Sequence, residues 1–282
     1  MKKLFFLLGI LFLSGCSGTD KREKALVQDD YTFIKGINLY HKGKKKEALK
    51  EYEEIYRKNS KNLMVMKEMA VVNCELGNKD AAVYYLEKAY EIAPKDESVI
   101  KNLANVYYRN KQFEKAEKYL DIFPKDSKDD IILKLRGYIA YEKKDYESSY
   151  NYLKNVQEEK YDMRLYHVLK NDLVNLNRKE NLYSLLNKKY EIYSHERDYI
   201  ILYCCSLSDI FNEKDSAAKI LIRYISEYGG DDELFLMLST LYLENGEKEK
   251  AFNSFELISD AYKYEAEYIE LREKLKRNSI DD

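Results

Sequence analysis

The fold is decided by a stretch of 34 residues, 63–96, which reads LMVMKEMAVVNCELGNKDAAVYYLEKAYEIAPKD. Apolar side chains recur in it every three or four positions, the spacing that places them on one face of an α-helix. Gly77 interrupts this pattern with a residue that turns the chain easily, and Pro94 stands where a second helix must end. The stretch therefore predicts two helices joined by a short turn.

The same arrangement returns along the chain with a period of 33 or 34 residues. A small residue marks six of the repeats, with one double period between the fourth and fifth: Ala48, Ala82, Ala116, Ser149, Ala217 and Ala251. A large apolar residue follows each of them four positions later: Tyr52, Leu86, Leu120, Leu153, Leu221 and Phe255. A second small residue precedes each by twelve positions: Gly36, Ala70, Ala104, Gly137, Cys205 and Ser239. Such a period predicts an array of helical hairpins.

This pattern resembles the tetratricopeptide repeat, a helix-turn-helix unit whose small residues at positions 8 and 20 let its two helices cross closely. The resemblance implies an all-α fold, a right-handed α-solenoid of hairpins over residues 29–265. About seven units are expected: 29–62, 63–96, 97–129, 130–162, 163–197, 198–231 and 232–265. In the fifth unit Leu182 or Tyr183 stands at the second small position, so we expect that hairpin either to pack more loosely or to be slightly rotated.

The N-terminus has the features of a secretory signal peptide. Met1-Lys2-Lys3 is basic, the apolar run 4–13 is too short to span a bilayer, and small residues precede Cys16. The ending Leu-Ser-Gly-Cys resembles the lipobox of bacterial lipoproteins, which implies cleavage after residue 15 and acyl chains such as palmitate on Cys16. Residues 16–28 are then a lipidated flexible tether. The alternative is an ordinary secreted protein with a chance cysteine at the cleavage site.

The C-terminal segment predicts one more amphipathic helix. Tyr264, Tyr268, Leu271 and Leu275 recur at spacings of four, three and four in the charged stretch 263–277. The last hairpin of a repeat array exposes an apolar face that a capping helix commonly covers. We therefore expect a cap, with its end and the C-terminal tail at 266–282. The alternative is an amphipathic helix that binds a partner.

Composition excludes several functions. The formal charge is −2, from 48 basic and 50 acidic residues, so the chain has no general attraction for nucleic acid. The three histidines His41, His167 and His195 stand in no metal-binding motif, and no phosphate loop or nucleophile motif occurs. Cys74 and the adjacent pair at 204–205 are best interpreted as packing residues. We therefore expect no enzyme, no cofactor or metal, and no small-molecule substrate.

Partner-binding residues follow from the resemblance, because ligands of this family lie in a groove lined by the first helix of each unit. The groove positions that carry basic or polar side chains beside tyrosines are Lys67, Lys101, Asn105, Tyr108, Arg109, Lys134, Tyr138, Tyr141 and Arg164. This set suits an extended peptide with acidic side chains or a free C-terminal carboxylate. The alternative is that these lysines are merely solvated.

Two further features of the groove qualify that prediction. Some members of the family bind a carboxylate with a clamp of Lys and Asn; Lys101 and Asn105 match it, but Leu135 and Val168 replace its polar groups, so we expect no clamp. Groove residues of the last two units are more apolar, at Tyr199, Leu202, Leu236 and Leu243. These residues either hold a hydrophobic anchor or close against the cap.

Together these features predict a membrane-anchored scaffold of the bacterial cell envelope that binds other proteins or extended peptides. Its lipid would hold it to a membrane, facing the periplasm or the cell surface. One alternative is a surface-exposed lipoprotein that binds an external or host ligand. A second is a component of outer-membrane or pilus assembly machinery.

Overall fold

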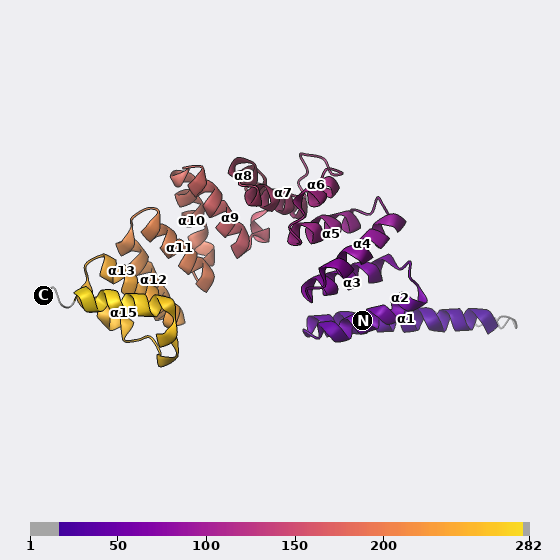
Figure 1. Ribbon diagram of the computed structural model, residues 1–282, viewed down its shortest axis with the longest axis horizontal. Coiled ribbons are helices and arrows are strands. Elements are labelled where there is room, and N and C mark those ends of the chain that lie inside the picture. The colour runs from indigo at the N-terminus through magenta and orange to yellow at the C-terminus, as the bar shows by residue number, and fades with distance from the viewer. Residues whose placement is uncertain (1–16, 279–282) are drawn as a thin grey trace, which may run out of the picture. The chain divides into compact units, whose positions relative to one another are not determined.

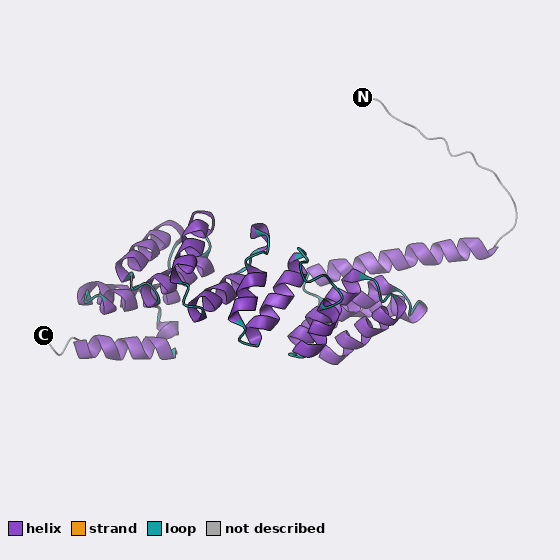
Figure 2. Ribbon diagram, turned by 90° about the horizontal axis from the view of Figure 1, so that it is seen from above, coloured by secondary structure: helices purple, strands orange, loops and turns teal. Residues whose placement is uncertain are grey.

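The computed structural model describes residues 17–278; the expected signal peptide, 1–15, and Cys16 lie outside the described residues. Every regular element within 17–278 is helical (Figure 2). The chain divides into two compact units, one up to Ser127 and one from Lys128 onward. The first unit contains three hairpins, and the second contains four hairpins and a last helix (Figure 1).

Each hairpin consists of a helix A and a helix B. In chain order the pairs are α1 (Ser17–His41) with α2 (Lys45–Lys58), α3 (Leu63–Glu75) with α4 (Lys79–Ile92), α5 (Glu97–Arg109) with α6 (Phe113–Leu120), α7 (Asp130–Glu142) with α8 (Tyr146–Leu153), α9 (Met163–Asn175) with α10 (Lys179–Tyr193), α11 (Arg197–Asp209) with α12 (Lys214–Tyr228), and α13 (Asp232–Glu244) with α14 (Lys248–Phe255). Two 3₁₀ helices, η1 (Glu158–Lys160) and η2 (Asp260–Tyr264), and helix α15 (Ala266–Asn278) complete the described part. The predicted hairpins are therefore present.

The small residues of the repeat lie where the two helices of a hairpin cross. Ala48 and Ala82 are fully buried. At Gly36 an added Cβ would lie 2.5 Å from the ring of Tyr52, and at Gly137 it would lie 2.5 Å from Leu153. Side chains cannot be that close, so the spacing of the helices in these hairpins depends on the small residues.

The turns between helices A and B share one backbone feature. One residue per turn has a positive φ: Gly43, Gly77, Lys111, Lys144, Asn177, Asn212 and Gly246. A residue with this conformation ends a helix and lets the last carbonyl groups of the helix accept hydrogen bonds. In the second hairpin, for example, the Asn78 N–H donates to the carbonyl oxygen of Asn73 over 2.8 Å. Lys111 and Lys144 adopt this conformation although a Cβ makes it unfavourable.

The A helices α3, α5, α7, α9 and α13 begin at side-chain caps. The caps are Asn62, Asp96, Asp129, Asp162 and Asp231, each of which accepts a hydrogen bond from a backbone N–H two or three residues later. A cap of this kind satisfies one of the N–H groups that the first turn of a helix leaves without a partner. The sequence thus fixes where each of these helices begins.

Two terminal segments differ from the sequence-based expectation. Helix α1 begins at Ser17, so residues 17–28, expected as a flexible tether, are helical. Residues 22–26 (Arg-Glu-Lys-Ala-Leu) are good helix formers, and they continue directly into the first repeat. At the other end Tyr264 is 88% exposed, so its assignment to the apolar stripe of the cap was wrong. It belongs to η2, and the chain turns at Glu265 before α15 begins.

Helix α15 covers the last hairpin, as expected of a cap. Tyr268 and Leu271 are buried against Phe255 and Ile258, and Leu275 packs beside them. The helix begins 34 residues after the start of α13, and like the A helices α3, α5, α7, α9, α11 and α13 it contains 13 residues. It therefore occupies the place that helix A of a further repeat would take.

The fifth hairpin is more open than the others, as its sequence predicted. Helices α9 and α10 make fewer close backbone approaches than the helices of the other six hairpins. Large residues, Lys170 and Leu182, stand at its two small positions, and Leu182 is fully buried. Tyrosine rings fill the wider space: the Tyr166 ring lies 5.8 Å from that of Tyr193 and 5.5 Å from that of Tyr199, centroid to centroid. Aromatic packing thus replaces close helix contact here.

A buried carboxyl group lies beside the same hairpin. Asp172 in α9 is fully buried, and its carboxylate accepts a 2.6 Å hydrogen bond from the Ser149 hydroxyl on α8. At the tenth position, where α9 holds Asp172, helices α3, α5, α7 and α13 hold aliphatic residues: Val72, Val106, Ile139 and Leu241. Burial raises the pKa of Asp172 to about 7, although the Ser149 hydrogen bond opposes that change.

Of the three described cysteines, Cys204 has a packing role. The three form no disulfide with one another. Cys204 is fully buried, and its thiol lies 3.5 Å from the carbonyl oxygen of Ala217 in the facing helix. Burial raises the pKa of this thiol to about 12, so it stays protonated and unreactive at neutral pH.

Candidate functional site

The groove lysines predicted from the sequence connect successive repeats. In the first compact unit, which ends at Ser127, Lys67 on α3 donates a 3.4 Å hydrogen bond to the Ser98 hydroxyl. The Nζ atom of Lys67 also lies 3.9 Å from the carboxylate of Asp96. Asp96 is also the residue that caps α5. Lys67 therefore links one helix A to the beginning of the next.

The second unit repeats this arrangement with shorter distances. Lys134 on α7 lies 2.7 Å from the carboxylate of Asp162, which caps α9, and also donates to the carbonyl of Lys160. Burial alone would raise the pKa of Asp162, but hydrogen bonds from Lys134 and from the Leu165 N–H lower it overall. A peptide carboxylate would have to compete with Asp162 for this lysine.

Arginine provides a third link between repeats. The Arg197 guanidinium donates to both carboxylate oxygens of Asp231, over 2.7 and 3.1 Å, and also contacts Glu233. The Arg197 hydrogen bond is the main reason that the pKa of Asp231 is lowered. Asp231 caps α13, so here again a cation of one repeat holds the cap of the next.

The remaining predicted groove residues lie in two separate sets. In the first unit Tyr108 is buried with its ring centroid 6.0 Å from that of Phe113, and Lys101 and Asn105 are half-buried. Arg109 is exposed at the end of α5. These residues share one helix, as the sequence predicted.

In the second unit the predicted residues Tyr138 and Arg164 contact each other, and Tyr141 contacts Asn171 of α9. The Arg164 guanidinium lies 4.4 Å above the ring of Tyr138, which is buried. The Tyr141 hydroxyl accepts a 2.8 Å hydrogen bond from the Asn171 side chain. Tyr138 thus contributes mainly to the core, while Arg164 stays exposed above it.

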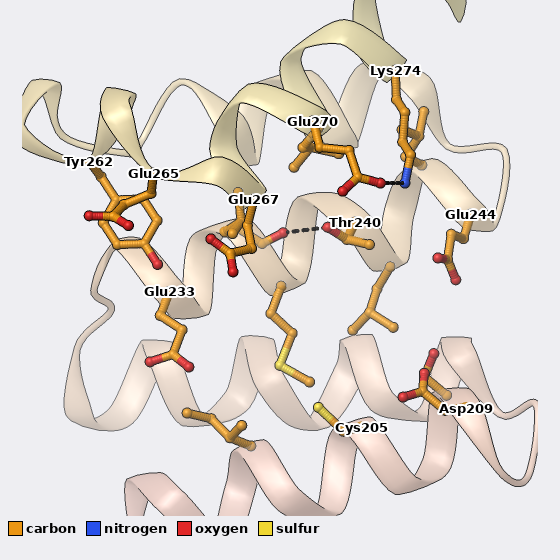
Figure 3. A pocket seen from close by; sticks show the side chains of 17 residues that line it. Cys205, Asp209, Glu233, Thr240, Glu244, Tyr262, Glu265, Glu267, Glu270 and Lys274 are labelled. Atoms are coloured by element: carbon orange, nitrogen blue, oxygen red, sulfur yellow. Dashed lines mark hydrogen bonds and ion pairs between the residues drawn. The ribbon is translucent and has the colours of Figure 1, made fainter.

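A pocket at the C-terminal end of the second unit was not predicted. Its volume is 590 Å³, and it lies between the A helices α11 and α13 on one side and η2 with α15 on the other (Figure 3). Half-buried apolar side chains form its floor: Ile201, Leu236, Met237 and Leu243. Of the apolar groove residues expected here, Leu236 and Leu243 line the pocket, whereas Tyr199 and Leu202 are buried in the core.

Carboxylates surround this apolar floor, and we call the site the acidic pocket. Its charged lining consists of Asp209, Glu233, Glu244, Glu265, Glu267, Glu270 and one lysine, Lys274. In Figure 3, Glu270 and Lys274 are joined across the pocket wall, 2.7 Å apart. A sequence signal that could have indicated the site is the group of acidic residues 265, 267 and 270 within the stretch predicted to form the cap.

The described residues show no feature of a metal or membrane-spanning site. Within 17–278 no group of three His, Cys, Asp or Glu side chains is placed to hold a metal ion. None of the helices in this range has the length and apolar composition needed to cross a bilayer.

Helical hairpins that recur at a regular spacing along the chain, most of them crossing at small residues, define a helical-repeat protein. Two family models described as tetratricopeptide repeat match this chain, at residues 33–97 and 75–136. Residues 33–136 therefore contain tetratricopeptide repeats. No curated protein matches the chain in sequence.

Solved structures show the same fold. A tetratricopeptide repeat protein from Parabacteroides merdae is 15% identical, with a TM-score of 0.57 over 88% of this chain and 97% of that one. PilF of Pseudomonas aeruginosa is 18% identical, with a TM-score of 0.57 over 75% of this chain and 97% of that one. PilW, a type IV pilus biogenesis factor, is 12% identical, with a TM-score of 0.50 over 86% and 97%. At these identities the similarity establishes the fold alone.

Proposed function

We propose that this protein is a lipid-anchored scaffold of the bacterial cell envelope, which holds a segment of a partner protein against its A helices. The single observation that carries the proposal is the pocket of 590 Å³ on the A helices α11 and α13, with an apolar floor and a charged rim. Its volume lies in the range of ligand-binding pockets, and its charged rim can orient a ligand of opposite charge. The tetratricopeptide fold supports a protein or peptide as the ligand.

Photocrosslinking in cells tests where a partner binds. A photoreactive amino acid at Met237 samples the acidic pocket, and one at Arg109 samples the basic residues of the first unit. A third variant, at the exposed Arg223 on α12, is the control. We expect one defined product at Met237 or Arg109 and none at Arg223. Absence of a defined product at both A-helix positions would contradict the scaffold proposal.

The membrane anchor is proposed from the lipobox at Cys16. Replacing Cys16 with serine removes the thiol that would accept a diacylglycerol, so we expect the variant to leave the membrane fraction. Fractionation of cells that produce each form measures this. A variant that stays in the membrane fraction contradicts lipid anchoring, and it leaves the binding proposal untouched.

A role in pilus assembly is the second candidate, favoured by the shared fold of PilF and PilW. Its test is whether the crosslinked partner is a pilus component. A surface-exposed lipoprotein that binds an external ligand is the third, and protease treatment of intact cells distinguishes it. Cleavage without lysis would support exposure at the surface.

A further inference from the structure

The acidic pocket exists because α15 stands where the next helix A would lie. Its buried residues Tyr268 and Leu271 face the last hairpin, while Glu267 and Glu270 point into the pocket (Figure 3). Across the opening, α13 contributes Glu233 and α11 contributes Asp209. Carboxylates from three helices therefore converge on one cavity.

Intramolecular ion pairs neutralise only half of these carboxylates. Glu233 contacts Arg197, Glu244 lies 2.8 Å from Lys214, and Glu270 pairs with Lys274. Within residues 17–278, no ion pair involves the other three: Asp209, Glu265 and Glu267. The pocket therefore has an uncompensated negative charge, which attracts cations and repels acidic peptides.

The floor of the pocket restricts the ligand further. Ile201, Leu236 and Met237 are apolar and only half-buried, so an apolar side chain placed on them would complete their burial. A free inorganic cation cannot do this, and the described residues offer no cluster that would hold a metal ion. The ligand must combine a positive charge with an apolar group.

We infer that the acidic pocket binds a segment of a partner protein in which lysine or arginine flanks an apolar side chain. The apolar side chain lies on Met237 and its neighbours, and the cationic groups reach Asp209, Glu265 and Glu267. This inference rests on the proposed scaffold function and names the chemistry of its partner. The ligand of the acidic pocket would thus be cationic, whereas the sequence predicted an acidic peptide for the groove lysines of the other repeats.

A designed peptide tests the inference directly. The probe is a fluorescein-labelled nine-residue peptide of alternating lysine and leucine, and fluorescence anisotropy measures its binding to the full chain. The variant Glu265→Gln/Glu267→Gln removes two unpaired carboxylates from the pocket. The matched control, Glu180→Gln/Glu191→Gln, removes two exposed carboxylates from α10 in the same unit.

We expect the pocket variant to raise the dissociation constant about three- to tenfold, because each exposed ion pair contributes modestly. The control variant should change it less than about twofold on the same grounds. A peptide of lysine and serine, with equal charge, should bind more weakly than the lysine–leucine peptide because it cannot cover the apolar floor. Raising the salt concentration should weaken binding of both peptides.

Three results would overturn the inference. The first is equal loss of binding in the pocket and control variants, which would show nonspecific attraction to acidic surface. The second is equal binding of the leucine and serine peptides, which would remove the role of the floor. If crosslinking in cells finds a partner at Arg109 and none at Met237, the scaffold function stands and this inference fails.

Discussion

The buried carboxyl group of Asp172 makes the stability of the second unit depend on pH. In the folded chain burial raises its pKa to about 7, whereas the unfolded chain has the ordinary value of 3.8. Between these two values the folded state keeps a proton that the unfolded state has lost. Stability therefore falls as pH rises from 4 to 7 and is constant above 7, since both states are then ionised.

The size of the effect follows from the difference in pKa. A difference of one in pKa corresponds to about 1.4 kcal/mol, so between pH 5 and pH 8 the free energy of unfolding should fall by about 2 to 3 kcal/mol. Asp172→Asn keeps an oxygen that can accept the Ser149 hydrogen bond and removes the titration. From pH 5 to pH 8, the free energy of unfolding of Asp172→Asn should therefore rise by the same amount relative to that of the natural chain.

Urea unfolding followed by circular dichroism at pH 5, 6.5 and 8 measures this difference. Comparing the two proteins at each pH cancels the other titrating groups, since only residue 172 differs. Ser149→Ala is the control: it removes the hydrogen-bond donor and keeps the carboxyl group, so it should retain a steep pH dependence. Parallel curves for the natural chain and Asp172→Asn would refute the reasoning.

Three further predictions concern the repeat geometry and can be checked by thermal or urea unfolding. Lys144→Gly should stabilise the fold by about 0.5 to 1 kcal/mol, because Lys144 has a φ of 62°, whereas Lys143→Gly in the adjacent helical conformation should not. Gly137→Ala should destabilise it by about 1 to 3 kcal/mol, since its Cβ would overlap Leu153; a stabilised variant would contradict the close crossing. Asp162→Ala should cost about 1 to 2 kcal/mol and Asp162→Asn clearly less, because asparagine still caps α9. Equal losses would show that the cap contributes little.

The hairpins could be predicted because their determinants are local. Gly36 and Gly137 lie at helix crossings, as the 34-residue period indicated, and the replacement of a small residue by Leu182 correctly marked the more open hairpin. Tyr264 was misassigned for a local reason too. The apolar spacing continued through it, and a spacing alone does not reveal the turn before α15.

The candidate site was harder to predict because it depends on contacts between repeats. The sequence identified Lys67 and Lys134 as groove cations, but only the structure shows that a capping aspartate lies beside each. The acidic pocket combines residues from Asp209 to Glu270, and their convergence depends on where α15 packs. Periodicity describes one repeat at a time, so it does not show which charges meet across a boundary.

The cations that hold the caps of following helices also affect how the array unfolds. In a linear array each hairpin contacts only its neighbours, so cooperativity depends on the strength of each boundary. At Asp162 and Asp231 one carboxylate both starts a helix and binds the preceding repeat, so a hairpin that unfolds also removes a partner from its neighbour. Salt screens the ionic part of this coupling and leaves the caps in place. We therefore expect higher ionic strength to weaken this part of the coupling between neighbouring hairpins.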